Sequence, residues 1–275
     1  MNDDTFLFYF AAMKRRSFLK QTALVSAAYP LVQSLESFVP VAKNPVKKLF
    51  VTGGAYDLAT IKFLASLTGK QNPKICFLPT PVGDSEAHIN RWFAAAKLLP
   101  IQPFVQKVFI TSGEQKTSFE ETLLQMDAIL VTGGNTLNAI TLWKAHGIDN
   151  ILRKAWEKGI VLSGPSAGAI CWFDEGLSDS RPIHLTKVEG LHFLKGSMCP
   201  HYHTEKERRP ILLDWVEKEK IMPGYALDET AGLYFENETL KRVVAQNATD
   251  KAYRLTLKGG KVQEEVMAAE LLPGE

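Results

Sequence analysis

The stretch Ile160-Val-Leu-Ser-Gly-Pro-Ser166-Ala-Gly-Ala-Ile-Cys-Trp172 decides the fold of this chain. Its apolar start predicts a buried strand, and the small residues after Ser166 predict the first turn of a helix. Gly164-Pro-Ser-Ala-Gly168 matches G-x-S-x-G, the pattern of a nucleophile elbow, in which a sharp strand-to-helix turn pushes the serine out of the sheet. Glycines flank the serine because neighbouring backbone must approach it closely. The stretch therefore predicts an α/β fold with Ser166 as a candidate nucleophile.

The same five residues also fit a plain strand–turn–helix connection, in which the Ser166 hydroxyl only caps the helix. At a nucleophile elbow, by contrast, the backbone N–H of Ala167 lies at the amino end of the helix and can stabilise an oxyanion. The pentapeptide alone does not separate these two interpretations, so the surrounding sequence has to decide.

Strand and helix patterns alternate along the chain before the elbow. Short apolar strands are predicted at 48–52, 74–78, 105–110 and 128–132. Helices are predicted at 56–67, 86–99, 117–125, 136–145 and 148–158, the third of them opening with a capping box at Thr117 and Glu120. This order predicts a mostly parallel sheet with helices on both faces.

Ligands of such a sheet bind beyond the carboxyl ends of its strands. Four segments lie at predicted strand ends: Gly53-Gly54, Pro79-Thr80, Gly133-Gly134 and Ser166. After Ser166 the chain is predicted to be loop-rich as far as His203. A helix at 207–218, a short strand at 225–228 and antiparallel strands at 232–236, 241–245 and 252–257 are then predicted.

Composition bounds the class of protein. The chain has 275 residues, 45% of them hydrophobic, and a net charge of +2. We therefore expect one α/β domain at 43–275, and the near-neutral charge gives no support for nucleic-acid binding. Cys76, Cys171 and Cys199 form neither a disulfide framework nor a C-x-x-C metal pattern, so no metal or other cofactor is predicted.

Residues 1–42 are interpreted as an export signal and linker. Residues 14–20 read Lys-Arg-Arg-Ser-Phe-Leu-Lys, and the apolar segment 22–35 follows. This pattern resembles a twin-arginine signal, with Met13 as the expected start, whereas a basic surface helix is the alternative. We therefore expect the twin-arginine export machinery as a partner and a periplasmic or otherwise exported location. Cleavage after Ala27 or near Ala42 is open, and an uncleaved segment would leave the protein membrane-anchored.

A catalytic serine needs a base, and the base needs an orienting acid. His201 and His203 lie two positions apart after Pro200, so both imidazoles share one side of an extended chain. That spacing also fits a pair of metal ligands. The acid is open at this point: Asp174, Asp179, Asp228 and Glu229 are the candidates. An ordinary α/β-hydrolase runs in the order serine, acid, histidine, and its histidine is expected near the carboxyl end of the chain. Here the last histidine is His203, and 72 residues follow it, so that fold is less favoured.

Four blocks, in order, resemble the serine peptidases of the dipeptidase E (aspartyl dipeptidase) and cyanophycinase family. They begin at Gly133 (Gly-Gly-Asn-Thr), Gly164 (Gly-Pro-Ser-Ala-Gly-Ala), Pro200 (Pro-His-Tyr) and Ala226 (Ala-Leu-Asp-Glu). The resemblance extends from Lys48 to about Leu257. It implies a flavodoxin-like fold related to class I glutamine amidotransferases, with serine in place of their cysteine.

The resemblance also implies roles for individual residues. Ser166 would be the nucleophile, His201 the general base and Glu229 the residue that orients it. The backbone N–H groups of Gly134 and Ala167 would form the oxyanion hole. Asp179 is the second candidate for the orienting acid, and Asn135 of the first block is a further site candidate.

The chain departs from the dipeptidase pattern at the arginine that recognises an aspartyl residue. Arg208 and Arg209 lie closer to His201 than that pattern places it. Our hypothesis is an exported serine peptidase that cleaves peptide or isopeptide-like bonds in small peptides, Asp-containing ones among them. The alternatives are a non-catalytic binding module on the same fold and a carboxylesterase that uses the same serine.

Overall fold

The computed structural model describes residues 44–54 and 56–272. The predicted export segment at 1–42 lies outside these residues and stays a prediction. Within the two described ranges, none of the helices has both the length and the apolar character needed to cross a membrane.

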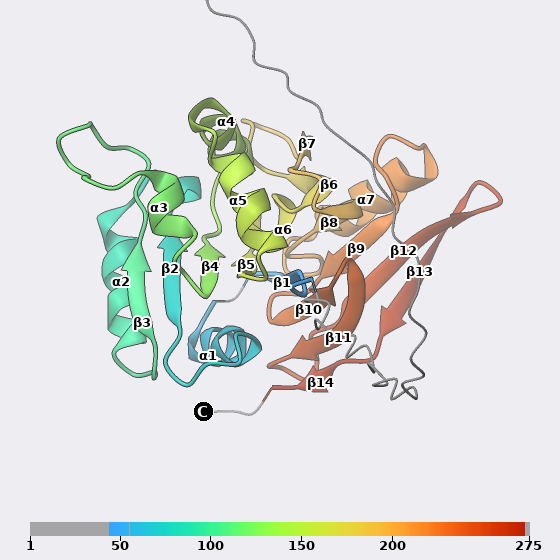
Figure 1. Cartoon of the computed structure of the whole chain (residues 1–275). Coiled ribbons are helices and arrows are strands. Elements are labelled where there is room, and N and C mark those ends of the chain that lie inside the picture. Colours follow the sequence, from blue (N-terminus) through green and yellow to red (C-terminus); the bar gives the residue numbers. More distant parts are fainter. Residues whose placement is uncertain (1–43, 55, 273–275) are drawn as a thin grey trace, which may run out of the picture. The chain divides into compact units, whose positions relative to one another are not determined.

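Eight strands of the described chain form one sheet, in the order β14-β11-β10-β1-β5-β4-β2-β3 (Figure 1). The strands β1 to β5 pair in parallel, whereas β10 runs antiparallel to both β1 and β11. Their bounds are β1 (Lys48–Thr52), β2 (Lys74–Leu78), β3 (Gln102–Val105), β4 (Ala128–Val131), β5 (Val161–Pro165), β10 (Ala231–Glu236), β11 (Thr239–Ala245) and β14 (Glu270–Leu271).

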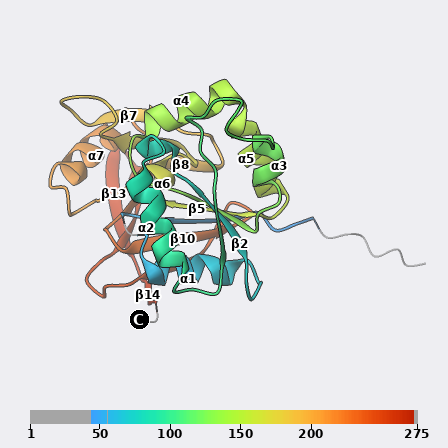
Figure 2. The same cartoon turned by 90° about the vertical axis from the view of Figure 1, so that its left-hand side faces the viewer.

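Helices cover both faces of this sheet (Figure 2). On β1, Phe50 packs in a cluster with side chains of α1 (Leu58–Leu67) and α2 (Glu86–Ala96). Its neighbours Leu49 and Val51 point to the opposite face, because successive strand side chains alternate. There they pack in the cluster formed with α3 (Phe119–Leu123), α4 (Thr136–His146), α5 (Ile148–Glu157) and α6 (Ala167–Ile170). The predicted flavodoxin-like α/β fold is confirmed.

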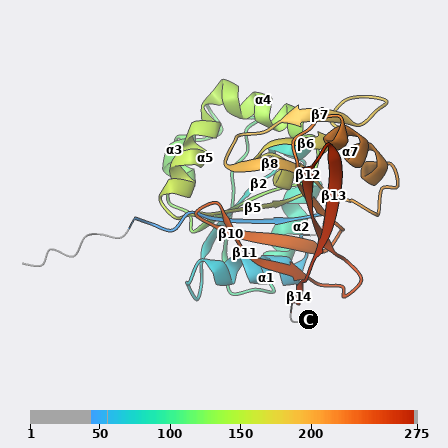
Figure 3. The same ribbon diagram turned by 90° about the vertical axis from the view of Figure 1, so that its right-hand side faces the viewer.

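A second sheet holds much of the chain after the elbow. Its order is β13-β12-β9-β8-β6-β7, and β8 runs parallel to both β6 and β9. The strands are β6 (Phe173–Ser178), β7 (Thr186–Glu189), β8 (Leu194–Cys199), β9 (Gly224–Leu227), β12 (Ala252–Lys258) and β13 (Lys261–Met267). The helix α7 (Arg208–Glu217) packs on one face through Leu212 and Val216, beside β13 in Figure 3. Phe173 and Met198 on the other face join the main core.

The prediction of a loop-rich segment up to His203 is wrong, because β6, β7 and β8 lie there. All three strands carry charged residues, and β6 and β8 also carry an interior glycine, as in Phe-Asp-Glu-Gly-Leu-Ser of β6. Such strands show no alternating apolar pattern and become recognisable only through their pairing. The antiparallel strands predicted at 232–236, 241–245 and 252–257 are present, but the last belongs to the second sheet.

Two local predictions are corrected. The strand expected at 105–110 lies at Gln102–Val105, where Pro103 sits on the edge strand of the sheet. The capping box of α3 is formed by Ser118 and Glu121, one position after the predicted pair. The Ser118 hydroxyl accepts from the Glu121 N–H at 3.1 Å, and the Glu121 carboxylate accepts from the Ser118 N–H at 2.7 Å.

Candidate active site

Strand ends from the two sheets bring the candidate residues together. Ser166 follows β5 and Gly134 lies just beyond β4, both in the first sheet. His201 and Glu229 follow the neighbouring parallel strands β8 and β9 of the second sheet. The site is thus built from carboxyl ends of parallel strands, as expected for α/β sheets, but from two sheets instead of one.

Ser166 has the backbone geometry of a nucleophile elbow. Its φ of 51° and ψ of −113° lie in a region that non-glycine residues rarely occupy, and such strain concentrates at functional sites. Added Cβ atoms would lie 2.6 Å from Gly168 O at Gly164 and 2.6 Å from Val131 O at Gly168, so both positions require glycine. The Ser166 side chain makes no capping hydrogen bond to α6. The helix-cap interpretation is therefore wrong.

A chain of hydrogen bonds joins three of the predicted residues. Ser166 Oγ lies 2.8 Å from Nε2 of His201, and Nδ1 of the same ring lies 2.7 Å from Oε2 of Glu229. A carboxylate only accepts, so Nδ1 carries the proton and Nε2 is left to accept from the serine. The hydrogen bond from His201 lowers the pKa of Glu229. This arrangement of serine, histidine and carboxylate has the geometry of a catalytic triad.

Gly54 is a site residue that the sequence marked only as a strand end. Its N–H donates to the backbone oxygen of Glu229 at 2.8 Å. A Cβ added at Gly54 would lie 2.0 Å from Glu229 Oε1 and 2.6 Å from His201 Cε1. Only glycine can therefore occupy this position while the histidine–carboxylate pair stays in place. In the sequence, the glycine pair Gly53-Gly54 indicates a close approach to the backbone. It does not reveal that the side chains of Glu229 and His201 are the ones that approach.

Two backbone donors lie beside the serine. Neither Gly134 nor Ala167 donates its N–H to another residue in the described part of the chain. The preceding Gly133 lies against the serine, since a Cβ there would be 3.4 Å from Ser166 Cβ. Gly134 has φ of 125°, and its added Cβ would lie 2.4 Å from Pro81 O. The loop is thus fixed in a conformation that leaves the Gly134 N–H available for an oxyanion, beside that of Ala167 at the start of α6.

The other candidate acids lie elsewhere. Asp179 is exposed and makes an ion pair with Arg208, at 3.8 Å. Asp174 contacts His192 at 2.9 Å, and Asp228 contacts His203 at 2.8 Å. The carboxylate on His201 is that of Glu229.

Asn135 has a supporting place next to the oxyanion loop. Its Oδ1 accepts from the Asn138 N–H at 2.9 Å and so caps α4. Its Nδ2 donates to the backbone oxygen of Ser180 at 3.0 Å. The residue therefore ties the loop that carries Gly134 to the segment that carries Asp179.

The two imidazoles of His201 and His203 bind different carboxylates, those of Glu229 and Asp228. They do not converge on a shared position as a pair of metal ligands would. Across residues 44–54 and 56–272, no group of three His, Cys, Asp or Glu side chains is arranged to hold a metal ion.

Neither Arg208 nor Arg209 is a free cation. Arg208 is buried, with Nε 2.6 Å from Glu205 and Nη1 2.9 Å from the backbone oxygen of Leu177. Arg209 forms a two-point ion pair with Glu264, at 2.6 and 3.1 Å. Both guanidinium groups are therefore engaged within the protein.

The fold and the site together define an α/β serine hydrolase of the flavodoxin-like type. The sequence model of peptidase family S51 matches residues 49–243. The chain belongs to this family and is a serine-type peptidase, which confirms the resemblance inferred from the four sequence blocks.

Relatives and solved structures agree with this assignment. The chain is 40% identical to the uncharacterized peptidase YgaJ of Bacillus subtilis over 208 residues, 76% of this chain and 89% of the relative. It is 26% identical over 143 residues to a protein named peptidase E from Shewanella denitrificans, covering 49% of this chain and 61% of the relative. The structure of a peptidase from an acI-B1 actinobacterium aligns with a TM-score of 0.64 at 20% identity, covering 82% of this chain and 96% of the other. This last likeness shows the fold.

Proposed function

We propose that the chain hydrolyses short peptides with Ser166 as nucleophile, His201 as general base and Glu229 as the orienting acid. The observation that carries this proposal is the continuous hydrogen-bond chain from Ser166 through His201 to Glu229, at 2.8 and 2.7 Å. The Ser166 hydroxyl donates to Nε2 of His201, and the Nδ1–H of His201 donates to Glu229. These are the directions that proton transfer from the serine requires.

The reaction follows from these positions. Ser166 Oγ attacks the carbonyl carbon while Nε2 of His201 takes the hydroxyl proton and then delivers it to the leaving amine. Glu229 stabilises the imidazolium that forms in between. The N–H groups of Gly134 and Ala167 bind the oxyanion, and losing one such donor costs about 2.7–4 kcal/mol of transition-state stabilisation. Water, activated by the same histidine, then releases the acyl group.

The proposed substrates are small peptides. The panel that tests them contains Asp-X, Glu-X, neutral X-X and isopeptide-like bonds. The relative named peptidase E supports peptides as the substrate class. Arg208 is paired with Glu205 and Arg209 with Glu264 of the same chain. The structure therefore provides no support for either arginine as the group that recognises an aspartyl side chain.

The test compares the wild type with Ser166→Ala on this peptide panel. Ser85→Ala is the matched control, since the Ser85 side chain makes no capping bond to α2. We expect turnover of at least one peptide class by the wild type and the control, and none by Ser166→Ala. Hydrolysis of matched esters alone would indicate a carboxylesterase, and binding without hydrolysis would indicate a binding module. Either result would contradict the proposal.

We further propose that residues 1–42 direct export through the twin-arginine pathway, on the basis of the paired arginines and the apolar segment that follows. Mass spectrometry of the amino terminus, together with cell fractionation, tests this. A processed end in an exported fraction is expected. An intact Met13 end in protein confined to the cytosol would contradict it.

A further inference from the structure

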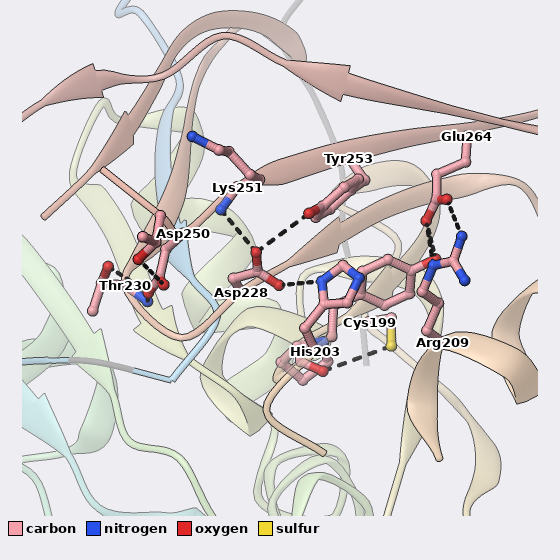
Figure 4. A network of polar contacts seen from close by, with 12 residues as sticks. Cys199, His203, Arg209, Asp228, Thr230, Asp250, Lys251, Tyr253 and Glu264 are labelled. Carbon is pink, nitrogen blue, oxygen red and sulfur yellow. Dashed lines mark hydrogen bonds and ion pairs between the residues drawn. The ribbon is translucent and has the colours of Figure 1, made fainter. Parts of the chain in front are cut away.

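The segment that carries His201 makes a second histidine–carboxylate contact beside the first. His201 contacts Glu229 at 2.7 Å, and His203, two positions later, contacts Asp228 at 2.8 Å. The two adjacent acids that follow β9 thus each contact one of the two histidines that follow β8. The first pair contacts Ser166 through His201. The second pair lies against the hairpin of β12 and β13, beside Tyr253 (Figure 4).

Asp228 is the centre of the second contact. It is buried, and its Oδ2 accepts from the backbone N–H of Lys251 at 2.8 Å and from the Tyr253 hydroxyl at 3.4 Å. Its Oδ1 accepts a hydrogen bond from Nδ1 of His203 at 2.8 Å. The backbone N–H of Asp228 also donates to Lys251 O at 3.0 Å. The acid is therefore fixed by Lys251 and by Tyr253 of β12, and it in turn fixes His203.

The residue between the two histidines is anchored as well. Tyr202 is buried, its N–H donates to Leu227 O at 2.9 Å, and its hydroxyl donates to Glu264 at 2.5 Å. The rings of Tyr202, His203 and Tyr253 pack on one another with centroids 4.9–5.1 Å apart. Three contacts thus hold the short segment that begins at His201.

His201 itself needs such support. Its φ of 53° lies in the left-handed region. A non-glycine residue persists there only when its surroundings fix the conformation. The contacts of Tyr202 and His203 lie directly after this residue, so they act on the backbone that sets the direction of the His201 ring.

We propose that His203 and Asp228 are positioning residues, whose hydrogen bond holds His201 and Glu229 at reacting distance from Ser166. This inference rests on the proposed function. Neither side chain contacts Ser166, and their effect passes through the two short segments 201–203 and 228–229. A displacement of about 1 Å at the reacting groups is enough to slow catalysis about 100-fold.

Two variants of His203 separate the hydrogen bond from the ring packing. His203→Phe keeps an aromatic ring against Tyr202 and Tyr253 but removes the donor to Asp228. His203→Asn loses the ring but keeps an N–H at the position of Nδ1. Asp228→Asn leaves one acceptor oxygen for two donors, Nδ1 of His203 and the N–H of Lys251, so one of the two bonds that fix the segments is lost.

His192→Phe is the matched control. His192 contacts Asp174 through Nδ1 at 2.9 Å, and its side chain is 48% exposed, against 47% for His203. It precedes the amino end of β8, whereas His201 follows the carboxyl end. The six residues of β8 separate the two positions by roughly 20 Å at about 3.3 Å per residue.

The measurement is the rate of Ser166 labelling by a fluorophosphonate, which requires no knowledge of the substrate. Saturation kinetics give the maximal rate, kinact, and the half-saturating concentration, KI, and thermal unfolding monitors folding. We expect kinact to fall about 10- to 100-fold in His203→Phe and Asp228→Asn at unchanged KI. His203→Asn should recover to within about 3-fold of the wild type, and His192→Phe should match it.

Wild-type kinact in folded His203→Phe and Asp228→Asn would overturn the inference while leaving the proposed function intact. An equal loss in His203→Phe and His203→Asn, in folded proteins, would also overturn it, because the hydrogen bond would then not be the cause. Absence of labelling at Ser166 in the wild type would instead refute the proposed function, and the inference with it.

Discussion

Replacing Gly54 by alanine tests the geometry of the site without touching the triad. The added Cβ would lie 2.0 Å from Oε1 and 2.4 Å from Cδ of Glu229, and 2.6 Å from Cε1 of His201. All three distances fall well short of van der Waals contact. The carboxylate and the ring would therefore have to shift by about 1 Å, which is enough to cost about 100-fold in rate, or about 2.7 kcal/mol at 1.36 kcal/mol per decade.

The assay is steady-state hydrolysis of the best peptide found in the panel. We expect kcat of Gly54→Ala to fall about 100-fold. Gly113→Ala is the matched control, because no atom lies within 4 Å of an added Cβ there. In a Glu229→Ala background the further loss at Gly54 should be smaller, since two of the three close contacts no longer exist.

Wild-type kcat in Gly54→Ala would refute the reasoning, because the close approach of Gly54 to the histidine–carboxylate pair would then have no effect on catalysis. Equal losses in Gly54→Ala and Gly113→Ala would refute it as well, since the second substitution meets no neighbouring atom.

Four further predictions concern Glu229, Gly134 and Arg208. Glu229→Gln should lower kcat by up to about 10⁴-fold, because its amide favours the wrong His201 tautomer; full activity would contradict this. The lowered pKa of Glu229 adds folding stability above its ordinary value of 4.5, which is lost as pH falls through the lowered value, so the wild-type advantage over Glu229→Gln in urea unfolding should shrink on acidification. Gly134→Ala should reduce kcat about 10²–10³-fold by displacing an oxyanion donor, and an unchanged kcat would exclude that donor. Arg208→Met should lower the free energy of unfolding by about 1–3 kcal/mol at unchanged KM, whereas a raised KM for Asp-X peptides alone would make it a specificity residue.

Local sequence was enough for the first half of the fold and for the nucleophile. The strands β1, β2, β4 and β5 are apolar runs that end at glycine, proline or threonine, and each is visible without its partners. The elbow at Ser166 is likewise a local motif, because the strand, the turn and the helix are consecutive in the chain.

The second sheet and the contacts between segments could not be predicted in the same way. The strands β6 and β8 contain glycine and charged residues, and they become recognisable only through pairing with each other and with β7 and β9. The approach of Gly54 to Glu229 joins residues that are far apart in the sequence. Residue type and spacing along the chain do not predict such a contact.

The choice between neighbouring acids shows the same limit. Asp228 and Glu229 are consecutive and both acidic, so their order alone does not say which one faces His201. In the structure Glu229 contacts His201, whereas Asp228 contacts His203 and the N–H of Lys251. The family resemblance predicted Glu229, whereas spacing left four acids open.

Mapping the covalent adduct of a fluorophosphonate tests the central claim most directly. The wild-type protein is treated with the reagent and analysed by intact mass and peptide mass spectrometry, beside His201→Ala. The account predicts a single adduct on Ser166, formed far more slowly in His201→Ala. An adduct on another residue, or none in a protein that hydrolyses peptides, would contradict it.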